Sequence, residues 1–131
     1  LKGGEIIMKK NISTDKAPSA IGPYSQAIEA NGLLITSGQL PIDPATGTMP
    51  ETVEEQTKQS LENCRAILEE GGADMKDVIK TTVFLSDMNN FGAMNGVYET
   101  FFEAPYPARS AVQVARLSKD ALVEIECIVS K

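Results

Sequence analysis

The chain has 131 residues, of which 42% are hydrophobic and 23% charged, a size and composition typical of one globular domain. It contains no histidine, which excludes His-ligated zinc sites and Ser-His-Asp or Cys-His catalytic sets. Its 12 basic and 18 acidic residues give a net charge of −6 and form no basic stripe. Binding to a phosphate backbone is therefore disfavoured.

Cysteine usage and hydropathy bear on the cellular location. Cys64 and Cys127 lie far apart in apolar patterns, and we interpret them as buried free thiols rather than as a disulfide or a metal cluster. No apolar run is long enough to span a bilayer, and the N-terminus lacks the apolar region of a signal peptide. These patterns predict a cytoplasmic protein.

Residues 1–7 differ from the rest of the chain. The codons of Lys2-Gly3-Gly4-Glu5 can spell a ribosome-binding site shortly before Met8. Our hypothesis is that Met8 is the natural start and that residues 1–7 are a leader or a flexible tail. We expect residues 8–131 to form a single domain.

The predicted elements alternate between strands and helices. The apolar positions from Val53 to Leu68 repeat every three or four residues, which predicts a helix that begins at a Thr52–Glu55 capping box and ends at Gly71-Gly72. A second helix, capped by Asp87 or Asn89, buries a stripe formed by Phe91, Met94, Tyr98 and Phe101.

Strand patterns occupy six segments, 9–14, 25–30, 33–38, 78–85, 111–115 and 122–129. Asn31-Gly32 predicts a tight hairpin turn between the second and third strands. The expected architecture is an α+β two-layer sandwich, in which two helices cover one face of a mixed sheet of five or six strands.

The other face of that sheet has an unusual composition. In the last strand Leu122, Glu124, Glu126 and Ile128 point away from the helix layer, and Val123, Ile125, Cys127 and Val129 point toward it. In segment 78–85, Ile79, Thr81, Val83 and Leu85 share one face. A face that mixes apolar residues with Glu and Lys is typical of an oligomer interface with polar pockets. The alternative is a solvated sheet face with scattered apolar residues.

Three candidate groups could carry chemistry. Arg109 lies between a Pro-rich loop and a strand, where a guanidinium can bind a planar anion, and the alternative is a simple surface charge. Gly38, after Ser37, would let a ligand approach the backbone, or it simply permits a turn. Desolvation of Glu124 could make it a usable base or acid, whereas an ion pair is the structural alternative.

At these residues the chain resembles the RidA/YjgF family of enamine and imine deaminases. Segment 20–27 (AIGPYSQA) resembles the family's N-terminal motif, and segment 107–117 (PARSAVQVARL) with 123–126 (VEIE) resembles its C-terminal motif. The resemblance covers the chain from about Lys9 to the end. It implies a chorismate-mutase-like fold that assembles as a homotrimer, with ligand sites between subunits.

The resemblance also implies roles for individual residues. Arg109 would bind the substrate carboxylate and Glu124 would position a water molecule. The family's ligand-contacting positions fall on Tyr24, Ser37, Gly38, Phe91 and Asn95. Ala111 stands where the family usually has cysteine, which removes any thiol-based function but keeps the backbone carbonyl that would contact ligand or water.

The implied reaction is the hydrolysis of reactive 2-enamino or 2-imino acids to 2-oxo acids and ammonia, without a metal or an organic cofactor. The implied substrates are short and are released by a pyridoxal-phosphate enzyme such as a dehydratase. Two alternatives remain open. One is a non-catalytic trimer that binds small carboxylates or unfolded protein. The other is endoribonuclease activity, which the acidic charge and the missing histidine disfavour.

Overall fold

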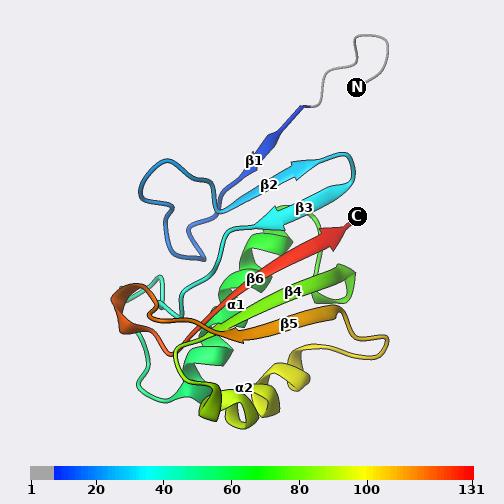
Figure 1. The fold of residues 1–131 in the computed structure, drawn as a ribbon. Coiled ribbons are helices and arrows are strands. Elements are labelled where there is room, and N and C mark those ends of the chain that lie inside the picture. Colours follow the sequence, from blue (N-terminus) through cyan, green and yellow to red (C-terminus); the bar gives the residue numbers. More distant parts are fainter. Residues whose placement is uncertain (1–7) are drawn as a thin grey trace.

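A computed structural model describes residues 8–131 and contains one six-stranded sheet with two helices (Figure 1). The strands are β1 (Lys10–Ile12), β2 (Ala27–Ala30), β3 (Leu33–Thr36), β4 (Val78–Leu85), β5 (Ala108–Gln113) and β6 (Val123–Ser130), and the helices are α1 (Val53–Glu70) and α2 (Phe91–Tyr98). The strand order is β1-β2-β3-β6-β4-β5. Only the β4–β5 pair is parallel among these strands. The mixed-sheet α+β prediction is confirmed, and the hypothesis about residues 1–7 lies outside the described residues.

Local signals in the sequence are realised where they were expected. Asn31 and Gly32 have positive φ angles of 54° and 78° and join β2 to β3, as the tight-turn prediction requires. Thr52 caps α1, and its Oγ1 accepts a hydrogen bond of 3.1 Å from the backbone N–H of Glu55. The helix ends at Gly71. Each of these signals acts between residues that are only a few positions apart. It can therefore be recognised without knowledge of the tertiary structure.

The core lies between α1 and the sheet, and α1 passes behind the central strands (Figure 1). The predicted helix stripe is buried. So are the residues of β6 that were expected to face it: Val123, Ile125, Cys127 and Val129. Both cysteines are buried free thiols, as expected. Among residues 8–131, no helix combines the length and the apolar character that a membrane span needs.

The open face of the sheet has the mixed composition that the sequence indicated, with one correction. Glu124, Glu126 and Ile128 are half-buried on this face. Ile79 was predicted to share a face with Thr81, but Ile79 is 48% exposed, whereas Thr81 and Val78 are buried. The β4–β6 register shifts between Val78 and Lys80. Such a bulge inserts one residue and reverses the alternation that the pattern assumed.

The region before Arg109 also differs from expectation. The expected strand 111–115 begins three residues earlier, because Ala108 pairs with Lys80 in the parallel ladder. Arg109 is therefore a residue of β5 rather than a residue that precedes the strand.

The expected second helix is divided into α2 and short 3₁₀ segments on either side, and Asp87 caps the first of them. In the expected stripe Met94 and Tyr98 are buried, whereas Phe91 and Phe101 are only partly buried.

Candidate active site

Arg109 projects from β5 onto the helix side of the sheet and is held by α2. Its partner in β4 is Thr81, which is fully buried beneath the helix layer. The Arg109 Nη1 donates a hydrogen bond of 2.6 Å to Asn95 Oδ1. The guanidinium carbon lies 5.3 Å from the centre of the Phe91 ring and 4.8 Å from that of Tyr98. These distances are within cation–π range, so contacts within the chain fix the position of the guanidinium.

The guanidinium opens onto a cavity of about 400 Å³. The lining residues are Asn95, Tyr98, Glu99, Tyr106, Pro107 and Arg109. A fixed guanidinium that remains accessible matches the bidentate recognition of a carboxylate. Asn95 and Arg109 were predicted as site residues, whereas Tyr98 was predicted only as part of a buried stripe, and Glu99 and Tyr106 were not predicted. The three-residue spacing of Asn95 and Tyr98 on one helix face was the signal that could have found Tyr98.

Glu124 lies on the open face of the sheet, beside the end of β3. Burial raises the pKa of the Glu124 carboxyl above its ordinary value, and the negative charge of Glu126 raises that pKa further. A backbone bridge between Gln39 and Ile125 brings Gly38 against this carboxylate. A Cβ at residue 38 would collide with the Glu124 carboxyl oxygen. Gly38 is therefore needed to leave room for that side chain, a role that the sequence did not reveal.

Tyr24 and Ser37 lie on the same side of the molecule as Gly38. Tyr24 is 53% exposed, and with Gly38 it contributes to a cavity of about 610 Å³. Ser37 Oγ donates a hydrogen bond of 2.6 Å to the Ser25 carbonyl, which ties β3 to the loop that carries Tyr24. Gln26 organises the same loop, since its side chain accepts from the Thr14 N–H at 2.7 Å and donates to the Pro18 carbonyl at 2.7 Å. No sequence pattern predicted this role for Gln26.

The predicted site residues form two separate groups within one chain. The first group, on the helix side, consists of Arg109, Asn95, Phe91 and Ala111, since Ala111 pairs with the buried Val83. The second group consists of Glu124, Gly38, Tyr24 and Ser37. Arg109 in β5 pairs with Thr81 in β4, and Thr81 pairs in turn with Cys127 in β6. Glu124 in β6 pairs instead with Phe84 in β4. The two charged groups thus differ by three residues along the strands, about 10 Å, and project from opposite faces. One chain does not bring Arg109 and Glu124 together.

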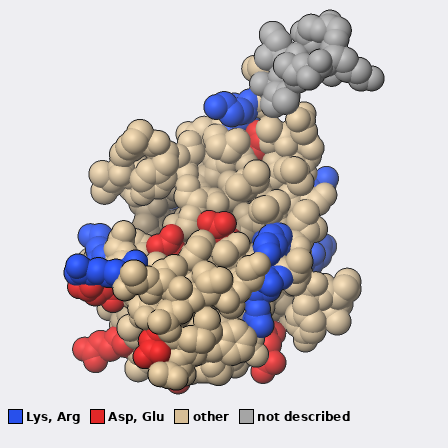
Figure 2. Space-filling view, viewed as in Figure 1, with Lys and Arg blue, Asp and Glu red and all other residues tan. Residues whose placement is uncertain are grey.

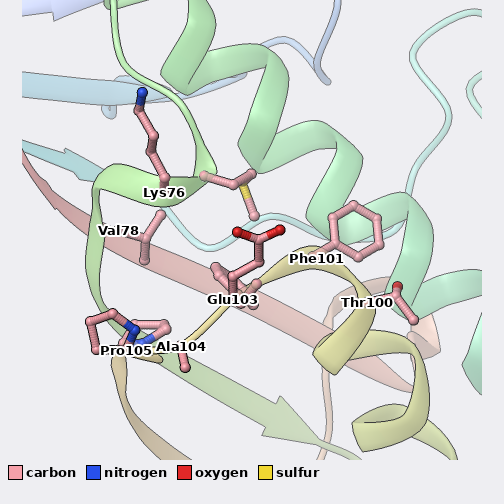
Figure 3. Close-up of a pocket in the computed structure, with 10 residues that line it drawn as sticks. Lys76, Val78, Thr100, Phe101, Glu103, Ala104 and Pro105 are labelled. Atoms are coloured by element: carbon pink, nitrogen blue, oxygen red, sulfur yellow. The ribbon is translucent and has the colours of Figure 1, made fainter.

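A third cavity, of about 420 Å³, lies on the other side of the loop before β5 (Figure 3). Its lining residues are Met75, Lys76, Val78, Thr100, Phe101, Phe102, Glu103, Ala104, Pro105 and Pro107. None of the predicted site residues is among them. The Glu103 carboxylate points toward the middle of this cavity, whereas the Lys76 ammonium points away from it (Figure 3). The candidate site residues therefore all lie outside this cavity.

The surface charge does not indicate a nucleic-acid site. Figure 2 shows separate acidic and basic clusters on the face that it presents, without a continuous basic band. Within the described residues, several basic side chains are also paired with acidic ones, as in the Arg116–Asp120 pair at 2.7 Å. The face shown in Figure 2 therefore lacks the electrostatic footprint that phosphate binding needs.

Comparison with known proteins identifies the family. Residues 14–131 match the model of the family described as endoribonuclease L-PSP. The chain is 52% identical over 124 residues to the 2-iminobutanoate/2-iminopropanoate deaminase of Salmonella typhimurium, an alignment that covers 92% of this chain and 97% of the relative.

Two solved structures show the same fold. A putative endoribonuclease from Thermotoga maritima is 50% identical, with a TM-score of 0.91 over 95% of this chain and 98% of that one. Escherichia coli TdcF with bound serine is 48% identical, with a TM-score of 0.90 over 93% of this chain and 98% of that one. The chain therefore belongs to the endoribonuclease L-PSP family, which is the RidA/YjgF family that its two sequence motifs indicated.

Proposed function

We propose that the protein is a hydrolytic deaminase that converts 2-imino acids, and the 2-enamino acids in equilibrium with them, to 2-oxo acids and ammonia. The observation that carries the proposal is that the chain holds both a fixed, accessible guanidinium at Arg109 and a half-buried carboxyl of raised pKa at Glu124. The printed name of the Salmonella relative supports the same activity at 52% identity.

The proposed reaction uses groups of this chain and water. Arg109 binds the substrate carboxylate, with Asn95 and the aromatic rings of α2 holding the guanidinium in place. The Glu124 carboxylate and the Ala111 carbonyl hold a water molecule, and Glu124 takes its proton as the oxygen adds to the C=N carbon. With the imine nitrogen already protonated, this addition gives a neutral carbinolamine. Glu124 then passes the proton it took to the nitrogen and the C–N bond breaks. Ammonia departs, and the hydroxyl group releases its proton to water to give the 2-oxo acid. Imines hydrolyse in water unaided, so orientation and one proton carrier are sufficient chemistry.

The proposal includes a homotrimer with sites between subunits. Arg109 and Glu124 lie on opposite faces of one sheet, so a complete site needs Arg109 from one copy and Glu124 from another. The apolar residues on the open face, with Ile35 at 48% and Val112 at 42% exposure, provide a surface that a second copy would bury. Tyr24, Ser37 and Gly38 then complete the wall around Glu124, and Phe91 borders the Arg109 side.

The proposed location is the cytoplasm. Both cysteines are free thiols, which suits a reducing compartment.

The decisive experiment couples a serine or threonine dehydratase to the purified protein and follows 2-oxo acid release. Glu124→Gln should lower kcat by about 10²- to 10⁴-fold, the usual contribution of a general base. Arg109→Ala should abolish both turnover and the binding of a small carboxylate. Full activity in Arg109→Ala would refute the site assignment. Binding without any acceleration would instead favour the non-catalytic carboxylate binder.

Coexpression of the two inactive variants tests the shared site. If each site takes Arg109 from one copy and Glu124 from its neighbour, random mixing leaves about a quarter of the sites intact. If each site lies within one chain, coexpression restores no activity.

Endoribonuclease activity is a second candidate because the family's description names it. A purified protein that cleaves RNA with the same dependence on Glu124, but leaves imines unchanged, would favour it.

A further inference from the structure

Tyr98 lies directly under the group that binds the substrate in the proposed function. Its ring centre is 4.8 Å from the guanidinium carbon of Arg109, and its side chain lines the cavity onto which Arg109 opens. The residue is nevertheless only 4% exposed. Tyr98 thus forms the floor of the anion site while remaining part of the core.

The hydroxyl of Tyr98 is tied to the sheet. Tyr98 Oη and Thr81 Oγ1 are 2.7 Å apart, and this hydrogen bond is buried. Thr81 is fully buried and is the direct β4 partner of Arg109. The hydrogen bond therefore joins the last turn of α2 to the strand position beside the one from which Arg109 projects. Burial raises the pKa of the Tyr98 phenol, so its proton stays available for the pair.

A second contact restrains the same ring. The Phe102 ring packs on Tyr98 with a centroid separation of 4.7 Å and an interplanar angle of 39°. The Tyr98 ring is thus held at its tip by Thr81 and on its side by Phe102. An arginine side chain has many rotamers, and fixing one of them before the ligand arrives reduces the entropy that binding must overcome.

We propose that Tyr98 and Thr81 are a positioning pair for the carboxylate anchor: the Thr81–Tyr98 hydrogen bond fixes the aromatic surface on which the Arg109 guanidinium rests. The proposal rests on the proposed function, because it assumes that Arg109 holds the substrate carboxylate. Neither residue touches the reacting atoms. Both act only through the orientation of Arg109.

The position of this pair determines which kinetic constant it affects. The carboxylate does not react and is bound alike in the ground state and the transition state, so a misplaced anchor raises KM and leaves kcat unchanged. Tyr98→Phe keeps the ring but removes the hydroxyl, and we expect a rise in KM of about fivefold. Tyr98→Leu also removes the aromatic face, and we expect a rise of about tenfold or more.

The test measures KM, kcat and Tm in the dehydratase-coupled assay for five variants. Thr81→Val should reproduce the KM of Tyr98→Phe, and Thr81→Ser, which keeps the hydroxyl, should restore the wild-type KM. Met94→Leu is the matched control, because Met94 is also buried in α2 but is not among the residues that hold the Arg109 guanidinium, which are Asn95, Phe91 and Tyr98. It should change Tm without changing KM. A purely structural role for Tyr98 would likewise lower Tm and leave KM unchanged.

A double-mutant cycle distinguishes action through Arg109 from an independent effect. In an Arg109→Lys background the guanidinium is gone, so Tyr98→Phe should no longer raise KM. An unchanged KM in Tyr98→Phe, in a protein whose turnover depends on Arg109, overturns the positioning pair and leaves the proposed function intact. A wild-type protein without deaminase activity overturns both.

Discussion

The Arg109 region and the Glu124 region hold their charged groups in different ways. Arg109 is surrounded by attractive contacts: a hydrogen bond to Asn95 and two aromatic rings. Glu124 is held on a surface that raises its pKa through burial and through the charge of Glu126. No ion pair or hydrogen bond is recorded for the Glu124 carboxylate within the described residues. The chain thus holds the Arg109 guanidinium firmly and leaves the Glu124 carboxylate poorly stabilised.

This difference agrees with the two roles that we propose, Arg109 as the binding group and Glu124 as the proton carrier. A binding group gains from being fixed before the ligand arrives, whereas a proton carrier needs a pKa nearer to the pH at which it works. The two regions also project from opposite faces of the sheet. Perturbations of the first region should therefore affect KM, and perturbations of the second should affect kcat and its pH dependence.

Apart from replacement of Glu124 itself, the largest effect expected in the Glu124 region comes from Gly38→Ala. The new methyl group would collide with the end of a flexible side chain, so the Glu124 carboxylate should move away at little cost to folding. We expect kcat to fall by about a hundredfold, the low end for loss of a general base, with Tm almost unchanged.

Gly92→Ala is the matched control for this substitution. A Cβ at residue 92 meets nothing within 4 Å, and alanine is the better helix former. Activity should be retained and Tm should rise slightly. If Gly38→Ala retained wild-type kcat, the Glu124 carboxylate would not need the position described above.

A smaller effect is expected in the Arg109 region from Asn95→Ala. The substitution removes a hydrogen bond of 2.6 Å to the guanidinium, and bonds to charged groups contribute about 1.5–3 kcal/mol. Because the aromatic rings still hold Arg109, we expect only part of that loss, a rise in KM of about tenfold with kcat unchanged. Steady-state kinetics with the coupled assay measure both constants.

The exposed Asn89 provides the control for Asn95. Asn89→Ala lies in the 3₁₀ segment before α2 and should leave KM unchanged. A fall in kcat for Asn95→Ala, with KM constant, would contradict the separation between the two regions.

The two regions were also predictable to different degrees. Thr52 and Asn31-Gly32 act on neighbouring residues, so the sequence alone was enough to place the helix start and the turn. The bulge that exposes Ile79 and the early start of β5 depend on pairing with distant strands. Those pairings decide which face Arg109 occupies, and one sequence does not reveal them.

The candidate residues themselves were found through the two family motifs, but their grouping was not. The separation of Arg109 from Glu124 follows from cross-strand register, and the function of Gly38 follows from where the Glu124 carboxylate lies. Tyr98 was placed correctly in a buried stripe. Its contact with Arg109 requires knowing that β5 runs beside α2, which no local pattern states.

The pH dependence of turnover provides a finer test of the Glu124 region. The proposed base works as a carboxylate, so kcat should fall as pH drops through the Glu124 pKa, at a higher pH than for an ordinary glutamate. Glu126→Gln removes the like charge that raises this pKa and should move the acidic limb of the profile to lower pH.

Glu103→Gln removes an exposed carboxylate from the loop before β5 and serves as the control for Glu126. Its pH profile should match that of the wild type. A profile of Glu126→Gln that moved to higher pH would mean that Glu126 does not act on the base through repulsion.

The smallest expected effect concerns stability. The folded-state pKa of Glu124 is raised above its ordinary value of 4.5, so above that folded pKa the buried charge destabilises the native state. As pH falls through the folded pKa, the native state takes up the proton before the unfolded state does, and the penalty disappears. Glu124→Gln should therefore raise Tm at pH 7 by about 1–2 °C, and this gain should vanish at pH values well below 4.5. Thermal melts at one fixed protein concentration measure the difference.

A Tm gain that persisted unchanged into acid would point to better packing by the amide rather than to relief of a buried charge. A variant that is more stable and less active is the outcome expected if the charge is kept at residue 124 for chemistry and not for folding.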